Sequence, residues 1–175
     1  HWIWYQIKSS LEVWIIQGQI KYIEKNEEEF IKLFQEVINE TKSEFIDPSI
    51  ADELMINTNG LILGNQYIMQ KPRAGNEYTI QGKLTMSAKA AAKAIRAVMN
   101  KIGKKAWNKM VKKMEQSTGI SLPWFHWKTI NGILDWLAGF KGTVEDALTQ
   151  FLVKRAKFSK KTARFVARTF IFLVL

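Results

Sequence analysis

Apolar side chains recur every three to four positions along most of this chain, which is the spacing of one face of an α-helix. Asn26 and Glu29 form a capping pair, and Phe30, Leu33 and Val37 continue the pattern behind it. Residues 2–23 are apolar on nearly all sides, which favours a buried helix; a pair of strands is the alternative, because the segment is rich in aromatic and β-branched residues. The first part of the chain is therefore predicted to be helical until Pro48, which ends the pattern.

The pattern changes between residues 52 and 85. Short apolar runs at 54–56, 61–63 and 67–69 are separated by Asn-Thr-Asn-Gly and Gly-Asn, and residues 78–86 alternate between apolar and polar. Asn and Gly tolerate the positive φ that tight hairpin turns require. This segment is predicted to form a small antiparallel β-sheet of three or four strands.

Helical spacing returns after Ser87, which is placed to cap a helix. The apolar stripe through Ile95 and Met99 shifts its register after Gly103, so two helices are predicted, at 88–102 and at 104–116. Three further helices are predicted: one begins at Ser121 and runs to residue 137, the second follows a capping box at Thr143, and the last begins at Ser159. The predicted fold class is thus α+β but mostly α, with N-terminal helices, a small antiparallel sheet and a C-terminal bundle of several helices.

The charge of the chain also changes near residue 86, where the helical pattern returns. Residues 1–85 hold 8 Lys or Arg and 12 Asp or Glu, a net charge of −4, whereas residues 86–175 hold 18 and 4, a net charge of +14. We therefore expect two regions, an acidic one at 1–85 and a cationic helical one at 86–175. An asymmetry of this size usually reflects an anionic partner.

Candidate chemistry is sparse. The chain has no cysteine and 2 histidines, of which His1 is terminal and His126 lies among aromatic residues. Disulfides, thiolate metal sites and histidine pairs at metal spacing are therefore excluded, and no phosphate-loop, dinucleotide or nucleophile-elbow motif is present. The sequence predicts a protein that is not an enzyme and that uses no cofactor, metal or small-molecule substrate. Its longest candidate for a membrane span, at 165–175, contains Arg168 and is too short for a membrane-spanning helix, which needs about 20 residues.

The cationic helices carry the functional prediction. Nine positive charges fall within residues 89–113, and a helix with one lysine face and one apolar face can lie on an anionic bilayer. Tryptophan is most stable at the interface between lipid and water. The predicted membrane-binding residues are six lysines for attraction and four tryptophans for insertion: Lys101, Lys104, Lys105, Lys109, Lys112, Lys113, Trp107, Trp124, Trp127 and Trp136.

Four segments, Ser87-Ala-Lys-Ala-Ala-Ala-Lys-Ala, Ile102-Gly-Lys-Lys-Ala-Trp-Asn-Lys, Gly142-Thr-Val-Glu-Asp-Ala and Ala163-Arg-Phe-Val-Ala-Arg-Thr, resemble the C-terminal part of a family of secreted toxins from staphylococci and bacilli. The run of short cationic helices is also similar to bacteriocins with a saposin-like bundle. This resemblance covers about half of the chain. It implies a secreted, membrane-acting antimicrobial or toxin with a cleavable signal peptide, and an immunity protein is a possible partner. It brings no catalytic residues.

Two other partners remain open. Basic helices also bind nucleic acid through its phosphates. Against a sequence-specific interaction, lysines outnumber arginines 14 to 4 after residue 85, and arginine is the preferred ligand of guanine. A non-catalytic domain that docks an acidic protein is the second alternative. The acidic region is itself complementary to the cationic one, so it is predicted to mask the lysines.

Overall fold

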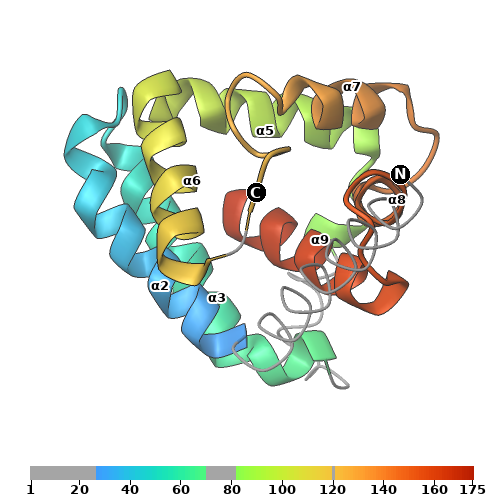
Figure 1. Ribbon diagram of the computed structural model, residues 1–175, viewed down its shortest axis with the longest axis horizontal. Coiled ribbons are helices and arrows are strands. Elements are labelled where there is room, and N and C mark those ends of the chain that lie inside the picture. The colour runs from blue at the N-terminus through green and yellow to red at the C-terminus, as the bar shows by residue number, and fades with distance from the viewer. Residues whose placement is uncertain (1–26, 70–81, 120) are drawn as a thin grey trace, which may run out of the picture.

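The computed structural model describes residues 27–69, 82–119 and 121–175 (Figure 1). In these ranges the chain forms seven α-helices and one short 3-10 helix. In order along the chain they are α2 (Glu27–Thr41), η1 (Lys42–Glu44), α3 (Ser49–Met69), α5 (Ala88–Ile102), α6 (Lys104–Thr118), α7 (Asn131–Gly139), α8 (Val144–Arg155) and α9 (Lys160–Val174). The helical bundle is confirmed. The segment at 2–23, predicted to be a helix, lies outside the described residues.

The predicted β-sheet is wrong: the described residues contain no strand, and the fold is all-helical rather than α+β. The first two predicted hairpin turns lie inside α3, where the polar side chains of the Asn-Thr-Asn segment find tertiary partners. Gln35 donates to the Thr58 hydroxyl and to Asn59 Oδ1, both at 2.8 Å, and Asn57 Nδ2 donates to the carbonyl of Leu173 at 3.0 Å. These bonds remove the need for the local turn that Asn and Thr otherwise favour. The last predicted strand, 78–86, lies partly outside the described residues, and its described end begins with a helical turn.

The predicted boundary at Gly103 is confirmed, since α5 ends at Ile102 and α6 begins at Lys104. Three of the other four helix starts predicted in the second half, those at Ser87, Thr143 and Ser159, are also confirmed as N-caps. Ser87 Oγ accepts the N–H of Ala90 at 3.2 Å. Thr143 and Ser159 cap α8 and α9 in the same way.

The helix predicted from Ser121 to residue 137 is wrong in its first half. Residues 121–130 form successive turns, and α7 begins only at Asn131. Side chains of α6 hold this loop: a Glu115 oxygen accepts the N–H of Leu122 at 2.8 Å, the other lies 2.7 Å from His126 Nε2, and Asn108 accepts the N–H of Trp127 at 2.9 Å. The bonds to Leu122 and Trp127 satisfy backbone N–H groups of the loop, so the loop is stable without being helical.

Helix α9 lies in the interior, between α3 on one side and α8 on the other (Figure 1). Its buried face includes Ala163, Ala167 and Ile171. Around it, α2 packs on α3 and α6, and α5 packs on α7. The resulting hydrophobic core includes residues from both sides of the charge boundary near residue 85.

Two polar side chains hold the C-terminal end of α9. Lys83 Nζ donates to the carbonyl of Phe172 at 3.2 Å and to Asn57 Oδ1 at 3.1 Å, and Asn57 donates to the next carbonyl, that of Leu173. The ammonium also lies 4.4 Å from the centre of the Phe172 ring. Because a positive charge is favourable at the negative end of a helix dipole, Lys83 fits this position. Burial nevertheless lowers the pKa of Lys83 below its usual value of 10.5.

Candidate functional site: the cationic faces of α5 and α6

The six predicted lysines, Lys101 at the end of α5 and the other five on α6, divide into two groups. Three of them face carboxylates of the acidic region: Lys105 and Lys109 lie 3.7 and 2.8 Å from Glu44, and Lys113 lies 2.7 Å from Glu40. Among the described residues, Lys101, Lys104 and Lys112 are exposed and lie within 4 Å of no carboxylate. Glu40 and Glu44 thus pair with three of the six lysines, although the side chain of Lys105 remains 87% exposed.

The carboxylates at this junction are held in their charged form. The hydrogen bond from Lys109, assisted by the charge of Lys105, lowers the pKa of Glu44. Hydrogen bonds from the hydroxyl and the N–H of Ser49 lower the pKa of Asp47, and Lys101 adds a smaller contribution. Both carboxylates therefore remain ionised at neutral pH and continue to attract the lysines.

The four tryptophans do not form an exposed patch. Trp107 is 5% exposed, and its indole N–H donates to the carbonyl of Phe125 at 2.7 Å. Trp124, Trp127 and Trp136 are half-buried against the core.

Two of these rings pack on the same residue of α8. Trp124 lies edge-on to Phe151 with ring centroids 5.4 Å apart, and Trp136 lies 6.0 Å from the same ring. The indole N–H of Trp136 donates to the carbonyl of Ala147 at 2.8 Å. In this conformation the tryptophans stabilise the bundle, and Trp107 can meet lipid only if the bundle opens.

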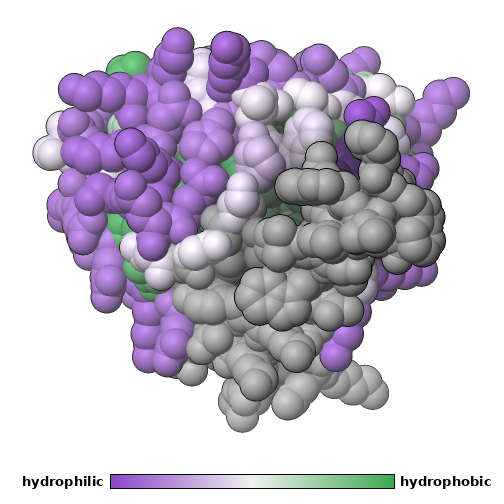
Figure 2. Space-filling view, viewed as in Figure 1, coloured by the Kyte–Doolittle hydropathy of each residue, from purple (hydrophilic) through white to green (hydrophobic). Residues whose placement is uncertain are grey.

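The described surface offers few other residues for insertion. On the face shown in Figure 2, hydrophilic residues cover most of the described surface over α2, α3 and α6. Among the residues whose exposure the structure describes, a set that leaves out 61–69 of α3, the large hydrophobic side chains that stand out in solvent are Ile46, at 73% exposure, and Ile56, at 69%.

A second cationic surface was missed as a site by the sequence analysis, although its residues belong to the nine counted charges. Lys89, Lys93 and Arg96 are exposed and follow one another at positions i, i+4 and i+7 of α5, which places them on one stripe. They line a groove of about 360 Å³ between α5 and α7, together with Asp135. Within the described part of the chain, none of the three lies within 4 Å of a carboxylate. Lys105, Lys109 and Lys112 of α6 have the same spacing, so no local signal in the sequence distinguishes the two sets of cations.

We name this surface the α5 groove. Three cations in a concave site attract a phosphate or another anion, because their fields add in the groove and exceed that of the one lining carboxylate, Asp135, which forms no described ion pair with them. The described residues contain no group of three or more His, Asp or Glu side chains that could hold a metal ion. None of the described helices is both long enough and apolar enough to cross a bilayer.

Comparison with known proteins adds no assignment. No protein-family model, no curated protein and no solved structure matches this chain.

Proposed function

We propose that this protein is a secreted, toxin-like protein that binds anionic lipid membranes, with the α5 groove as its first point of contact. The observation that carries this proposal is the stripe of Lys89, Lys93 and Arg96, which is exposed, concave and without an internal ion pair among the described residues. Its location in the half of the chain with a net charge of +14 supports the choice of an anionic partner.

The size of the effect follows from the charges. Each Lys or Arg close to an anionic leaflet contributes about 1 kcal/mol, so the three cations of the groove contribute about 3 kcal/mol. That corresponds to roughly a hundredfold in affinity, since about 1.4 kcal/mol equals a factor of ten. The remaining exposed lysines add long-range attraction, which salt screens.

Disruption of the membrane is the second step of the proposal. Lipid phosphates near the surface compete with Glu40 and Glu44 for Lys105, Lys109 and Lys113. Exchange of these partners loosens the contact between α6 and the acidic region. The apolar face of α6, with Trp107, then becomes accessible to lipid.

The test is co-sedimentation with vesicles of phosphatidylcholine containing about one-third phosphatidylglycerol, followed by a dye-leakage assay. Wild-type protein is expected to bind at low salt, to bind far more weakly at high salt, and to ignore vesicles of phosphatidylcholine alone. The triple variant Lys89→Gln, Lys93→Gln, Arg96→Gln is expected to lose roughly a hundredfold in affinity.

The matched control replaces Lys160, Lys161 and Arg155 by Gln. Like the triple variant, it removes two lysines and one arginine, but these three lie at exposed positions outside the groove. Equal losses in the two variants would show that net charge alone matters and would remove the groove from the proposal. Absence of salt-sensitive vesicle binding by the wild type, or tighter binding to duplex DNA or to an acidic protein, would refute the membrane function itself.

A further inference from the structure

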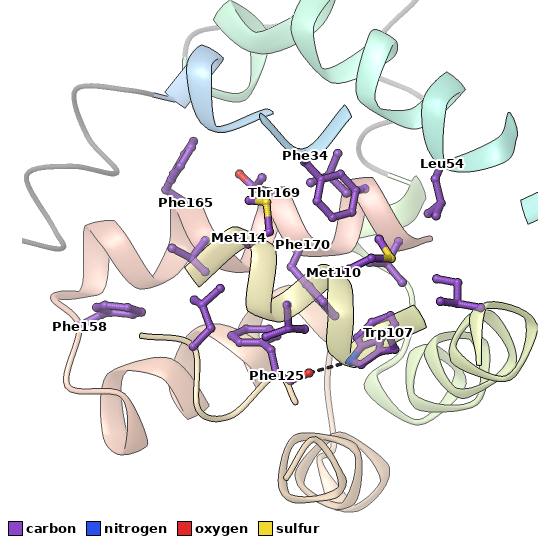
Figure 3. A pocket seen from close by; sticks show the side chains of 16 residues that line it. Phe34, Leu54, Trp107, Met110, Met114, Phe125, Phe158, Phe165, Thr169 and Phe170 are labelled. Carbon is purple, nitrogen blue, oxygen red and sulfur yellow. Dashed lines mark hydrogen bonds between the residues drawn. The ribbon is translucent and has the colours of Figure 1, made fainter. Parts of the chain in front are cut away.

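An apolar cavity separates α6 from α9. Figure 3 shows it extending from Phe158 and Phe165 at one end to Trp107 and Leu54 at the other, with Met110, Met114 and Phe170 between them. Side chains of α2, α3, the end of α5 and the loop before α7 complete the wall. Among the described lining residues, Thr169 alone has a side chain that is not hydrophobic.

The cavity is large enough for a small molecule. Its volume is about 130 Å³, close to that of an engineered apolar cavity of roughly 150 Å³ that stays dry and binds benzene. Its lining residues on α6 run from Trp107 to Met114, and those on α9 run from Phe165 to Val174. At about 1.5 Å per residue these spans are roughly two turns or more, so the shape suits an extended chain better than a compact ring.

The hydroxyl of Thr169 supplies the second observation. Thr169 is 4% exposed, and its Oγ1 has no hydrogen-bond partner among the described residues. A buried hydroxyl without a partner is unfavourable, since it has lost water and gained no bond in exchange. A ligand that brings one oxygen to this point would satisfy it.

We propose that this cavity binds one alkyl chain that carries a neutral oxygen, such as the hydroxyl of a medium-chain alcohol. The alkyl part lies against the methionine and phenylalanine side chains, and the oxygen bonds to Thr169 Oγ1. The oxygen must be neutral because no described lining residue carries a charge that could pair with a buried carboxylate. This inference is independent of the α5 groove.

The test is isothermal titration of the full chain with 1-hexanol, with benzene and with hexanoate at neutral pH. Saturable binding of 1-hexanol is expected, and hexanoate is expected to bind much more weakly. Thr169→Val keeps the shape of the side chain and removes the hydroxyl. It should lower the affinity for 1-hexanol roughly three- to tenfold, the fold-change of one net hydrogen bond, and leave benzene binding unchanged.

The matched control is Thr149→Val on α8. Thr149 is also buried, and its hydroxyl has no partner in the part of the chain that the structure describes, but it does not line the cavity. Both valine variants should unfold at a higher temperature than the wild type, and only Thr169→Val should change alcohol binding.

A third variant, Val166→Phe, fills the cavity from a half-buried position and should abolish binding while its helical circular dichroism is retained. The proposal is overturned if 1-hexanol gives no saturable heat, as would happen if another segment of the chain fills the cavity. It is equally overturned if Thr169→Val binds 1-hexanol as well as the wild type does, or if a folded Val166→Phe still binds it.

Discussion

Replacement of Gly103 by alanine should destabilise the junction between the two cationic helices. Gly103 has φ of 90° and ψ of 155°, a conformation that is essentially restricted to glycine. Its N–H donates to the carbonyl of Met99 at 2.7 Å and so ends α5, and its carbonyl accepts the N–H of Trp107 at 2.9 Å, in the first turn of α6. The two helices therefore take their relative direction from this residue.

The size of the effect can be worked from the structure. Holding a non-glycine residue in such a conformation costs about 1–3 kcal/mol. A Cβ at Gly103 would also lie 2.7 Å from Ile46 Cδ1, but the Ile46 side chain is 73% exposed and can move away at little cost. Alanine also lowers the conformational entropy of the unfolded chain, which stabilises the folded state by about 0.4–1 kcal/mol. The expected net loss is about 1–2 kcal/mol, or roughly 2–8 °C in Tm for a chain of this size.

The measurement is urea unfolding followed by circular dichroism, with Gly139→Ala as the control. Gly139 ends α7 without a positive φ, and a Cβ there would meet nothing within 4 Å, so alanine should be neutral or stabilising. The double variant Gly103→Ala, Ile46→Ala separates the two causes. If the double variant regains the lost stability, the contact with Ile46 rather than the backbone is responsible; if Gly103→Ala is as stable as the wild type, the reasoning fails.

Three further changes test other contacts. Glu40→Gln with Glu44→Gln should raise the affinity for anionic vesicles about tenfold or more, because the lysines that they pair with become free to meet phosphate; co-sedimentation measures this. Lys83→Met removes a group whose pKa is lower in the folded state than in the unfolded state. Between the lowered pKa and 10.5, the unfolded wild type binds more protons than the folded wild type does. Urea unfolding should therefore show that the stability of the wild type relative to the variant rises with pH through that window. Trp107→Phe removes the bond to the Phe125 carbonyl and should cost about 1–3 kcal/mol in the same unfolding assay.

Each of these has a decisive contrary result. For the glutamates the control is Glu36→Gln with Glu53→Gln, which changes the net charge equally at exposed positions with no described ion pair; an equal gain in affinity would argue against masking. If the difference in free energy of unfolding between wild type and Lys83→Met stays constant with pH, burial does not lower the pKa of Lys83. Unchanged stability of Trp107→Phe would mean that the indole bond contributes nothing net.

The helices of the second half could be predicted from sequence because their signals are local. Ser87, Thr143 and Ser159 cap helices through bonds to residues three positions ahead, so the pattern and the structure agree there. Helix α3 could not be predicted, because its polar side chains bond to other helices rather than within a turn. Asn57 donates to a carbonyl of α9, and the Thr58 hydroxyl accepts from Gln35 of α2. The start of α7 was predicted ten positions before its true start at Asn131, because side chains of α6 hold the preceding residues in a loop.

The candidate site was predicted only in outline. Charge density directed attention to the region from Lys89 to Lys113, but density does not show which cations have partners. Pairing depends on where α2 and η1 lie, and no local pattern places Glu40 and Glu44 beside α6. The amphipathic stripe that contains Trp107 was recognised, yet its burial followed from the packing of the whole bundle.

The bonds that hold the end of α9 have a consequence for the order of folding. Asn57 and Leu173 are 116 positions apart in sequence, and Lys83 and Phe172 are 89 apart. Closing loops of this length is entropically costly, and contacts between distant positions slow folding. Docking of α9 is therefore expected to be a late kinetic step, and the species that precedes it exposes the apolar surface that α9 will cover. Chaperones and proteases in the producing cell would act on that species, not on the finished bundle.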